Sequence, residues 1–447
     1  MKTLVIGAGE VGTNIARTLI ADGQEVTVIE RDPVRAEQAR IELDALVIEG
    51  NGASPRLLKE IGVSDFDLLA AVTTIDEVNI IASLSAKSEG VGTAVARIRD
   101  PDFFEEGRAS ETGVMGIDFV IDPDRATAED IAETIAIPGS VSVEYFGDGQ
   151  LAMVELIVGE DSPLIGHPLS ERERPHPAYI VGGSRAGVPF LARPDTVPEV
   201  GDHLILSTAS ANVKDAVAHL VGRVEPIRDV VIFGGGRIGL PLARALETKN
   251  VAVTVLERDA ERSAELAAAL GRALVINDEG ISKEAQEDAN VGSAGAFVAC
   301  AGDDRANLVA TLNARRAGAG LCLATISREE FSPLVDALGL DASFSPRLIA
   351  AEAILRFVHT KGVRAIHFFR TGFEAMEMEV EPGAEIIGMA IGETQGILGH
   401  CRVGALLHDD TIEIPTRGTE INEGDRLLVL GEQGTLRGIE SSFGGGK

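Results

Sequence analysis

The feature that most constrains this 447-residue chain is that much of its sequence occurs twice. The segment at 4–32, LVIGAGEVGTNIARTLIADGQEVTVIERD, matches VIFGGGRIGLPLARALETKNVAVTVLERD at 231–259. Further along, ALVIEGNGAS at 45–54 matches ALVINDEGIS at 273–282, with nearly the same separation between the copies. Repeats of this length indicate two copies of one structural unit, so one fold must explain both halves.

The parts between these segments repeat as well. IDPDRATAEDI at 121–131 resembles FSPRLIAAEAI at 344–354. DTVPEVGDHLILS at 195–207 likewise resembles TEINEGDRLLVLG at 419–431. Two modules, each close to half of the sequence, therefore account for nearly the whole chain.

Within each module the sequence pattern changes once. Short apolar runs first alternate with helical stretches, which is typical of a doubly wound parallel sheet, and period-two alternation between Gly and Pro turns then indicates a small mixed sheet. The predicted fold class is α/β: two tandem Rossmann-like doubly wound parallel-sheet domains, each followed by a small α+β subdomain. The predicted domains are a first Rossmann domain at 1–121, a crossover helix and small subdomain at 122–222, a second Rossmann domain at 229–344, and a crossover helix and small subdomain at 345–445, with a linker at 223–229.

A glycine-rich loop follows the first predicted strand. Its pattern, Gly7-x-Gly9-x-x-Gly12, permits a tight turn, close approach of a pyrophosphate to backbone N–H groups, and close helix–strand packing. Glu30 lies well beyond Gly12, at the end of the next strand. A carboxylate there accepts bonds from both ribose hydroxyls and repels a 2′-phosphate, which favours NAD or an adenosine nucleotide over NADP. The alternative is a tight turn in a Rossmann domain that binds nothing.

The second copy keeps the spacing but changes the charges. Gly234, Gly236, Gly239 and Glu257 repeat the first set. The substitutions are Arg237 for Glu10, Asp278-Glu279 for Gly50-Asn51, and Thr325 and Ser327 for Arg97 and Arg99. The second site is therefore expected to bind a different nucleotide or none. Arg237 is our candidate sensor of an extra phosphate, so Arg237→Ala is expected to blur any discrimination between ATP and ADP at this site.

Two further groups in the first module have alternative interpretations. Asp76, Glu77 and Asn79 stand at the start of a helix. One interpretation is helix capping, with Asp76 as the cap and the acids in the first turn, and the other is that the segment 73–79 closes over the nucleotide; both can hold together. Arg97 and Arg99 lie at the mouth of the sheet's carboxyl edge, where each is suited to bidentate phosphate contacts or to a plain ion pair.

The amino-acid composition limits which partners and which cellular compartment are plausible for this chain. With 40 Lys+Arg against 70 Asp+Glu, a formal charge of −30 disfavours nucleic-acid binding. Three isolated cysteines, Cys300, Cys322 and Cys401, indicate a reducing compartment and no metal site. Neither signal-peptide architecture nor an apolar run of about 18–20 residues is present, so we expect a cytoplasmic location.

A catalytic role has little support in the sequence. None of the eight histidines lies in a predicted Rossmann domain or forms a recognisable pair with an acidic residue, and no Walker lysine, HExxH or G-x-S-x-G motif occurs. We therefore expect no enzyme activity, with the nucleotide acting as a signal. The alternatives are an NAD-dependent oxidoreductase, which predicts a substrate-dependent change in cofactor absorbance, and a nucleotide sensor for another membrane transporter.

The whole chain resembles the regulatory subunits of Trk-type potassium uptake systems, which carry tandem regulator-of-K⁺-conductance (RCK) units. The residues that carry this resemblance are Gly7-Ala8-Gly9-Glu10-Val11-Gly12, Val28-Ile29-Glu30-Arg31-Asp32, Gly50-Asn51-Gly52, Ala71-Val72-Thr73, Asp76-Glu77-x-Asn79, Ala96-Arg97-Ile98-Arg99, Ser345-Pro346-Arg347, Ala353-Ile354-Leu355-Arg356-Phe357 and Glu423-Gly424-Asp425-Arg426-Leu427.

The resemblance implies a homo-oligomeric ring attached to the inner face of the membrane through a potassium-translocating Trk- or Ktr-type subunit. It implies NAD(H) at the first site, with ATP or ADP at either site, and a ligand that changes the shape of the ring. The candidate cofactor-binding residues are Gly7, Gly9, Glu10, Val11, Gly12, Glu30, Arg31, Asn51, Thr73, Thr74, Asp76 and Arg97 in the first pocket, and Gly234, Gly236, Arg237, Ile238, Gly239 and Glu257 in the second.

Overall fold

The structure is a computed structural model that describes residues 1–21, 23–100, 103, 116–171, 178–222, 225–328, 331, 334–335, 338–355, 362–369, 371–408 and 411–444. Arg223 and Val224 of the predicted linker, and Arg356 and Phe357 of the quoted motif, lie outside the described residues. The chain divides into two compact units. Unit 1 comprises Met1–Thr127 and Ser345–His359, and unit 2 comprises Ala128–Phe344 and Thr360–Lys447.

Unit 1 contains a six-stranded parallel sheet in the order β3-β2-β1-β4-β5-β6. The strands are β1 (Lys2–Ile6), β2 (Glu25–Glu30), β3 (Leu46–Glu49), β4 (Leu68–Ala71), β5 (Thr93–Arg97) and β6 (Phe119–Ile121). The helices between these strands are α1 (Glu10–Ala21), α2 (Pro33–Glu42), α3 (Pro55–Glu60) and α4 (Asp76–Glu89). The predicted Rossmann architecture is confirmed, and the strand order reverses between β1 and β4, where parallel sheets of this kind bind ligands.

Unit 2 contains the same sheet again, in the order β14-β13-β12-β15-β16-β17. Its strands are β12 (Asp229–Phe233), β13 (Ala252–Glu257), β14 (Leu274–Asn277), β15 (Ala296–Ala299), β16 (Leu321–Thr325) and β17 (Ala342–Phe344), and its helices include α7 (Gly239–Thr248), α8 (Ala260–Ala269), α9 (Lys283–Asp288) and α10 (Asp304–Ala317). Lys2, which begins β1, pairs with Glu25 in the first sheet, and Asp229, which begins β12, pairs with Ala252 in the second. The register of the strands therefore repeats with the sequence.

Two small five-stranded sheets complete unit 2, with the orders β10-β9-β11-β8-β7 and β18-β19-β22-β20-β21. Their strands are β7 (Ser140–Phe146), β8 (Leu151–Ile157), β9 (Ala178–Arg185), β10 (Val188–Leu191), β11 (His203–Ala209), β18 (Val363–Phe368), β19 (Phe373–Glu379), β20 (Arg402–His408), β21 (Thr411–Glu413) and β22 (Arg426–Glu432), with helices α6 (Val213–Val221), α13 (Gln395–Leu398) and α14 (Arg437–Glu440). The prediction of a mixed sheet is wrong, because their pairings are antiparallel. Tight connections, such as the turn at 147–150 between β7 and β8, are too short for the crossover that parallel neighbours need.

The two small sheets share one apolar core. Phe146, Met153 and Ile205 of the first sheet are buried with Phe373 and Leu428 of the second. Gly147 also donates its N–H to the carboxylate of Glu377, at 2.8 Å. The small subdomains of the two modules are therefore joined by a common core.

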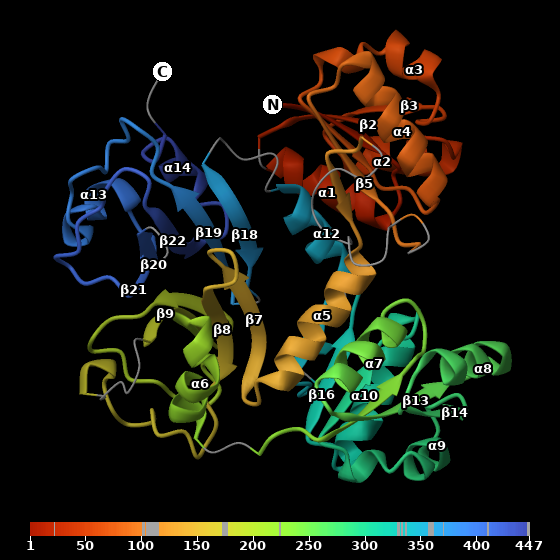
Figure 1. Cartoon of the computed structure of the whole chain (residues 1–447), viewed down its shortest axis with the longest axis vertical. Helices are drawn as coiled ribbons and strands as arrows, with labels where there is room; N and C mark the ends of the chain where they lie inside the picture. Colours follow the sequence, from red (N-terminus) through yellow and green to blue (C-terminus); the bar gives the residue numbers. More distant parts are fainter. Residues whose placement is uncertain are drawn as a thin grey trace. The chain divides into compact units, whose positions relative to one another are not determined.

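The crossover helices are α5 (Pro123–Ala136) and α12 (Pro346–Leu355). Ala128, Ile131 and Ile135 of α5 are buried with Leu242 and Leu246 of α7, in the core of the second Rossmann domain. Conversely, α12 packs against α1 of the first Rossmann domain (Figure 1). Each crossover helix thus covers the first helix of the other module's Rossmann domain.

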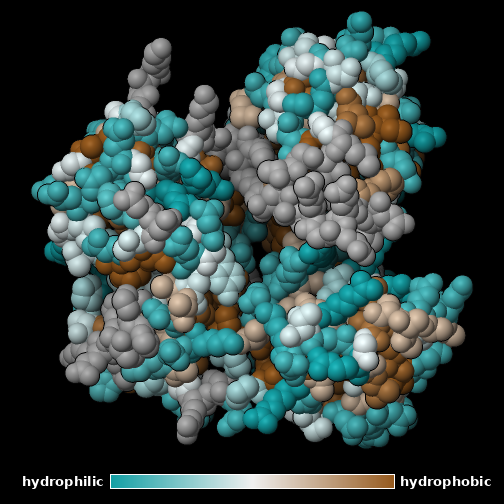
Figure 2. Space-filling view, in the orientation of Figure 1, coloured by the Kyte–Doolittle hydropathy of each residue, from teal (hydrophilic) through white to brown (hydrophobic). Residues whose placement is uncertain are grey.

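The surface gives no sign of a large apolar region on the face that is drawn. The face drawn in Figure 2 is largely hydrophilic, with smaller hydrophobic patches between. Within the described part of the chain, no helix is both long enough and apolar enough to cross a bilayer.

Candidate functional site

Each glycine of the first loop has a separate structural setting. Gly7 adopts φ +103°, a conformation that L side chains rarely adopt. A Cβ on Gly12 would lie 1.8 Å from the carbonyl oxygen of Gly7, so the start of α1 packs directly on the loop. A Cβ on Gly9, by contrast, would meet no described atom within 4 Å. The fold itself requires glycine at the first and third positions, whereas the middle position faces open space.

The second loop repeats these three settings. Gly234 adopts φ +100°, and a Cβ on Gly239 would lie 1.9 Å from the carbonyl oxygen of Gly234. A Cβ on Gly236 would again have open space, as far as the described atoms extend. Both loops therefore keep a middle glycine that packing does not explain, at the place where a pyrophosphate approaches the backbone in dinucleotide-binding loops.

Glu30 is buried, with 8% of its surface exposed, and it holds the first loop in shape. Its carboxylate accepts the N–H of Ala8 at 2.6 Å and the N–H of Asp32 at 2.8 Å. Glu257 does the same in the second copy, with Gly235 and Asp259, both at 2.9 Å. These contacts join the glycine loop to the end of the neighbouring strand. The role of Glu30 as a ribose ligand stays a prediction.

Several other predicted residues lie at the same edge of the first sheet. A Cβ on Gly7 would contact Thr73 at 3.1 Å, which sets Thr73 directly beside the glycine loop. Asn51 accepts the N–H of Ala53 at 3.1 Å in the loop after β3, and that loop packs on Ile6 at the end of β1. Glu10, Arg31 and Thr74 are exposed and Val11 is half-buried.

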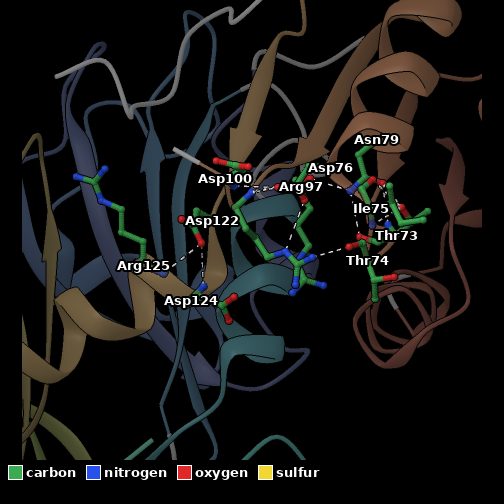
Figure 3. Close-up of polar contacts among 11 residues, drawn as sticks. Thr73, Thr74, Ile75, Asp76, Asn79, Arg97, Asp100, Asp122, Asp124 and Arg125 are labelled. Atoms are coloured by element: carbon green, nitrogen blue, oxygen red, sulfur yellow. Dashed lines mark hydrogen bonds and ion pairs between the residues drawn. The ribbon is translucent and has the colours of Figure 1, made fainter. Parts of the chain in front are cut away.

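Asn79 is a residue whose role the sequence did not reveal. It is fully buried, and its Oδ1 accepts the N–H of Thr73 at 2.8 Å while its Nδ2 donates to the carbonyl of Arg97 at 2.7 Å (Figure 3). Asn307 makes the equivalent bonds to Ala301 and Thr325. One amide thus joins the ends of two strands beside the loop. The signal that could have identified it is the occurrence of Asn at the same place in both copies.

The prediction that Asp76 caps α4 is wrong. The cap position is Ile75, and Asp76 is the first residue of the helix. The Asp76 carboxylate instead accepts the N–H groups of Arg99 and Asp100, both at 2.8 Å, and so fixes the chain that leaves β5 (Figure 3). In the second copy the helix is capped by Asp303, the counterpart of Ile75, whereas Asp304, the counterpart of Asp76, accepts the N–H groups of Ser327 and Arg328.

Arg97 is buried among charges at the end of β5. Burial, and then the nearby Arg99, lower the pKa of Arg97, while Asp124 opposes them. Burial also raises the pKa of Asp124, against the pull of Arg97 and Arg99. The Arg99 guanidinium donates to the carbonyl of Thr74 at 2.5 Å. Arg97 and Arg99 thus stand at the carboxyl edge of the sheet, and whether they contact phosphate stays a prediction.

Asp122 gives this region a pH dependence. Burial raises the pKa of Asp122 to about 6, although its carboxylate accepts the N–H groups of Asp124 and Arg125, both at 3.2 Å. A folded-state pKa above the unfolded value means that the stability from this carboxyl is present in acid and lost as the pH rises through about 6.

We therefore expect Asp122→Asn to stabilise the chain by about 1–2 kcal/mol at a pH near 8, with a gain that shrinks toward a pH near 4. The amide oxygen still accepts the two N–H bonds. Denaturant midpoints across this pH range measure the effect. A gain that is equal at both ends of the range would contradict it.

The second loop has its own set of contacts. Arg237 is exposed, and Ile238 is buried in the core of its domain. Arg262 of α8 donates its Nε–H to the carbonyl of Gly235 at 3.0 Å, a contact that the sequence did not reveal. The Asp278 carboxylate accepts the N–H of Gly280 at 3.2 Å.

The expectation that no histidine pairs with an acid is wrong. His203 lies 2.7 Å from Glu155, and His408 lies 2.5 Å from Asp425. The pairing is invisible in the sequence because each pair spans separate strands or turns. All four residues belong to the small subdomains, and none is in a Rossmann domain. Among the described residues, no cluster of His, Cys, Asp and Glu has the arrangement of a metal site.

Comparisons with known proteins agree with the duplication. The TrkA-N domain matches residues 3–130 and again 230–346. The TrkA-C domain matches residues 153–220 and 375–444. Both domains thus occur twice, in the order of the two modules.

Solved structures share the fold. The crystal structure of the GsuK RCK domain has a TM-score of 0.66 at 20% identity and covers 99% of this chain and 94% of that one. The GsuK channel bound to NAD has a TM-score of 0.65 at 20% identity and covers 99% of this chain and 78% of that one.

Curated relatives match over their whole length. The Trk system potassium uptake protein TrkA of Azorhizobium caulinodans is 30% identical, covering 99% of this chain and 98% of that protein. The protein of the same name from Haemophilus influenzae is 28% identical over the same shares. With both domain types matched twice and relatives matched end to end, this chain belongs to the TrkA family of Trk system potassium uptake proteins.

Proposed function

We propose that this chain is a nucleotide-binding regulatory subunit of a Trk-type potassium uptake system. The observation that carries the nucleotide part is the middle glycine of each loop. Gly9 and Gly236 have open space where a Cβ would stand, so packing among the described residues gives no reason for glycine there. Approach of a phosphate group to the bare backbone is such a reason.

For the first loop we propose NAD(H), with ATP or ADP able to bind at either loop. The buried carboxylate of Glu30 next to the loop supports a ligand with a free 2′-hydroxyl, because a 2′-phosphate would be repelled. GsuK, another protein with this fold, has been solved bound to NAD and to ADP. NAD and ADP are therefore the first ligands to test on this chain.

For the transport part we propose a ring of several copies, held at the inner face of the membrane by a potassium-translocating subunit. The names of the relatives support this partner. A nucleotide can drive such a switch only by binding one conformation more tightly than the other, and a difference of about 5.5 kcal/mol moves a two-state equilibrium from 1:99 to 99:1.

A catalytic alternative, an NAD-dependent oxidoreductase, needs an acid or base beside the nicotinamide. The histidine–acid pairs His203–Glu155, His367–Glu144 and His408–Asp425 of the described residues lie on the small sheets and their turns, outside both Rossmann domains. We therefore propose a signalling role for the nucleotide. Substrate-dependent oxidation of NADH by the purified chain would overturn this.

The first experiment is a thermal-shift titration with NADH, NAD, ATP, ADP and NADPH. A ligand at 100 times its Kd that binds only the folded state stabilises by about 2.7 kcal/mol. We expect a clear rise in midpoint with NAD(H) or adenine nucleotides and a smaller one with NADPH. If none of the five raises the midpoint, the loops are structural turns and the nucleotide switch is wrong.

The second experiment measures potassium flux in vesicles that hold a Trk-type membrane subunit, with and without this chain. The regulatory proposal predicts that added chain changes the flux and that the change depends on the nucleotide. A potassium flux that changes neither with the added chain nor with the nucleotide would contradict the regulatory proposal, even if the chain binds nucleotide.

A further inference from the structure

An arginine from the second module reaches the first glycine loop. Arg347 is the second residue of α12 and forms an ion pair with Glu10, the first residue of α1 and a member of the loop. The Arg347 side chain is mostly covered, with 15% exposed, whereas that of Glu10 is 66% exposed. The guanidinium is therefore held at the loop, and its carboxylate partner extends into water.

The electrostatics of this place favour an anion. The first turns of α1 and α12 meet at the ion pair, and each helix directs the positive end of its dipole there. To these the Arg347 guanidinium adds a full positive charge, opposed in the pair by the single carboxylate of Glu10. Ion pairs with an exposed partner contribute little to stability, because water solvates the carboxylate almost as well as the guanidinium does.

We propose that Arg347 is a phosphate-binding residue of the first nucleotide site and that Glu10 competes with the phosphate for it. Without nucleotide, the guanidinium pairs with Glu10. With nucleotide, it pairs with the pyrophosphate beside Gly9, and Glu10 turns into water. This rests on the proposed nucleotide function of the same loop.

The exchange is favourable on chemical grounds. A guanidinium binds phosphate through two parallel, charge-assisted hydrogen bonds, which are stronger than a pair with an exposed carboxylate. Release of Glu10 costs little since its side chain is already hydrated. Glu10 would otherwise stand beside the phosphates as a like charge, so its departure also removes a repulsion.

The arrangement is specific to the first loop. The second loop has Arg237 in place of Glu10, and α5 has Asp124 in place of Arg347, so the charges on loop and helix are interchanged. The position of α12 in the chain gives the contact a consequence. This helix follows β17 of the second Rossmann domain, with Ser345 between them. Phosphate held by Arg347 therefore acts on the segment that leaves the second Rossmann domain.

The test compares Arg347→Gln, Glu10→Gln and the control Arg56→Gln, an arginine 88% exposed on α3. All are made with Gly236→Asp, which places a carboxylate in the open space of the second loop and confines binding to the first. Isothermal titration calorimetry with ADP and with adenosine distinguishes a contact to phosphate from contacts to the adenosine part of the ligand, because adenosine has no phosphate. We expect Arg347→Gln to weaken the affinity for ADP about tenfold and Glu10→Gln to strengthen it about threefold. The affinity for adenosine should not change in either variant, and Arg56→Gln should change neither affinity.

The outcomes separate the two proposals. If the parent carrying Gly236→Asp binds neither ADP nor NAD(H), the nucleotide function of the first loop fails, whatever Arg347 does. If the parent binds ADP and Arg347→Gln binds it equally well, the role of Arg347 is wrong and the function stands. An equal loss for ADP and adenosine would also overturn the phosphate contact. If Arg347→Gln does not fold, the Glu10→Gln variant tests the proposal by itself. Unchanged or weaker ADP binding by Glu10→Gln would contradict the competition between Glu10 and phosphate for Arg347.

Discussion

Gly9→Asp is expected to abolish binding of ADP and NAD at the first loop, with an affinity loss of at least about 100-fold, or about 2.7 kcal/mol. The chain is expected to fold normally, because a Cβ at this position meets open space among the described atoms and the backbone is not in the left-handed region. The new carboxylate would occupy the approach of the phosphates and repel them. Titration in the Gly236→Asp background measures the loss.

Gly12→Ala is the matched comparison within the same loop. Its Cβ would lie 1.8 Å from the carbonyl oxygen of Gly7, a backbone atom that cannot move without opening the loop. We expect a destabilisation of about 3 kcal/mol, seen in the denaturant midpoint of the nucleotide-free chain. If Gly9→Asp lowered the midpoint as much as Gly12→Ala does, the middle glycine would be structural and the main support for a nucleotide site would be lost.

Asn79→Ala is expected to destabilise the first Rossmann domain by about 3 kcal/mol. The amide is fully buried and bonds the N–H of Thr73, at 2.8 Å, and the carbonyl groups of Thr73 and Arg97, at 3.1 and 2.7 Å. Alanine leaves these backbone groups buried without their partner. Hydrogen exchange of the amide protons at the ends of β4 and β5 reports the loss where it occurs.

Two variants control for this interpretation. Asn307→Ala removes the equivalent amide of the second copy, bonded to Ala301 and Thr325, and is expected to cost a similar amount in the second Rossmann domain. Glu77→Ala changes an exposed residue of the same helix as Asn79 and is expected to cost less than about 0.5 kcal/mol. An Asn79→Ala effect no larger than that of Glu77→Ala would show that the amide does not join the two strands.

Much of the fold and part of the site could be predicted from the sequence. The duplication predicted two equal Rossmann domains, since runs of apolar residues and glycine turns specify strands and loops locally. The spacing of Gly7, Gly12 and Glu30, and of their counterparts in the second copy, predicted residues that the structure brings together at one edge of each sheet. Where the local signal is ambiguous the prediction was wrong, as for Asp76, whose carboxylate bonds a distant loop, and for the pairing of the small sheets.

Only the tertiary structure decided which modules touch. The helical period of α5 and α12 predicts that each helix has an apolar face, but no local pattern says which domain covers that face. Burial of Ile131 in one core with Leu242, and the packing of α12 on α1, depend on residues far apart in the chain. The same holds for Asn79, Arg262 and Arg347, whose partners are also distant in the sequence. The sequence by itself thus determined the two Rossmann domains and their glycine loops, and non-local packing determined that a helix of the second module lies at the glycine loop of the first.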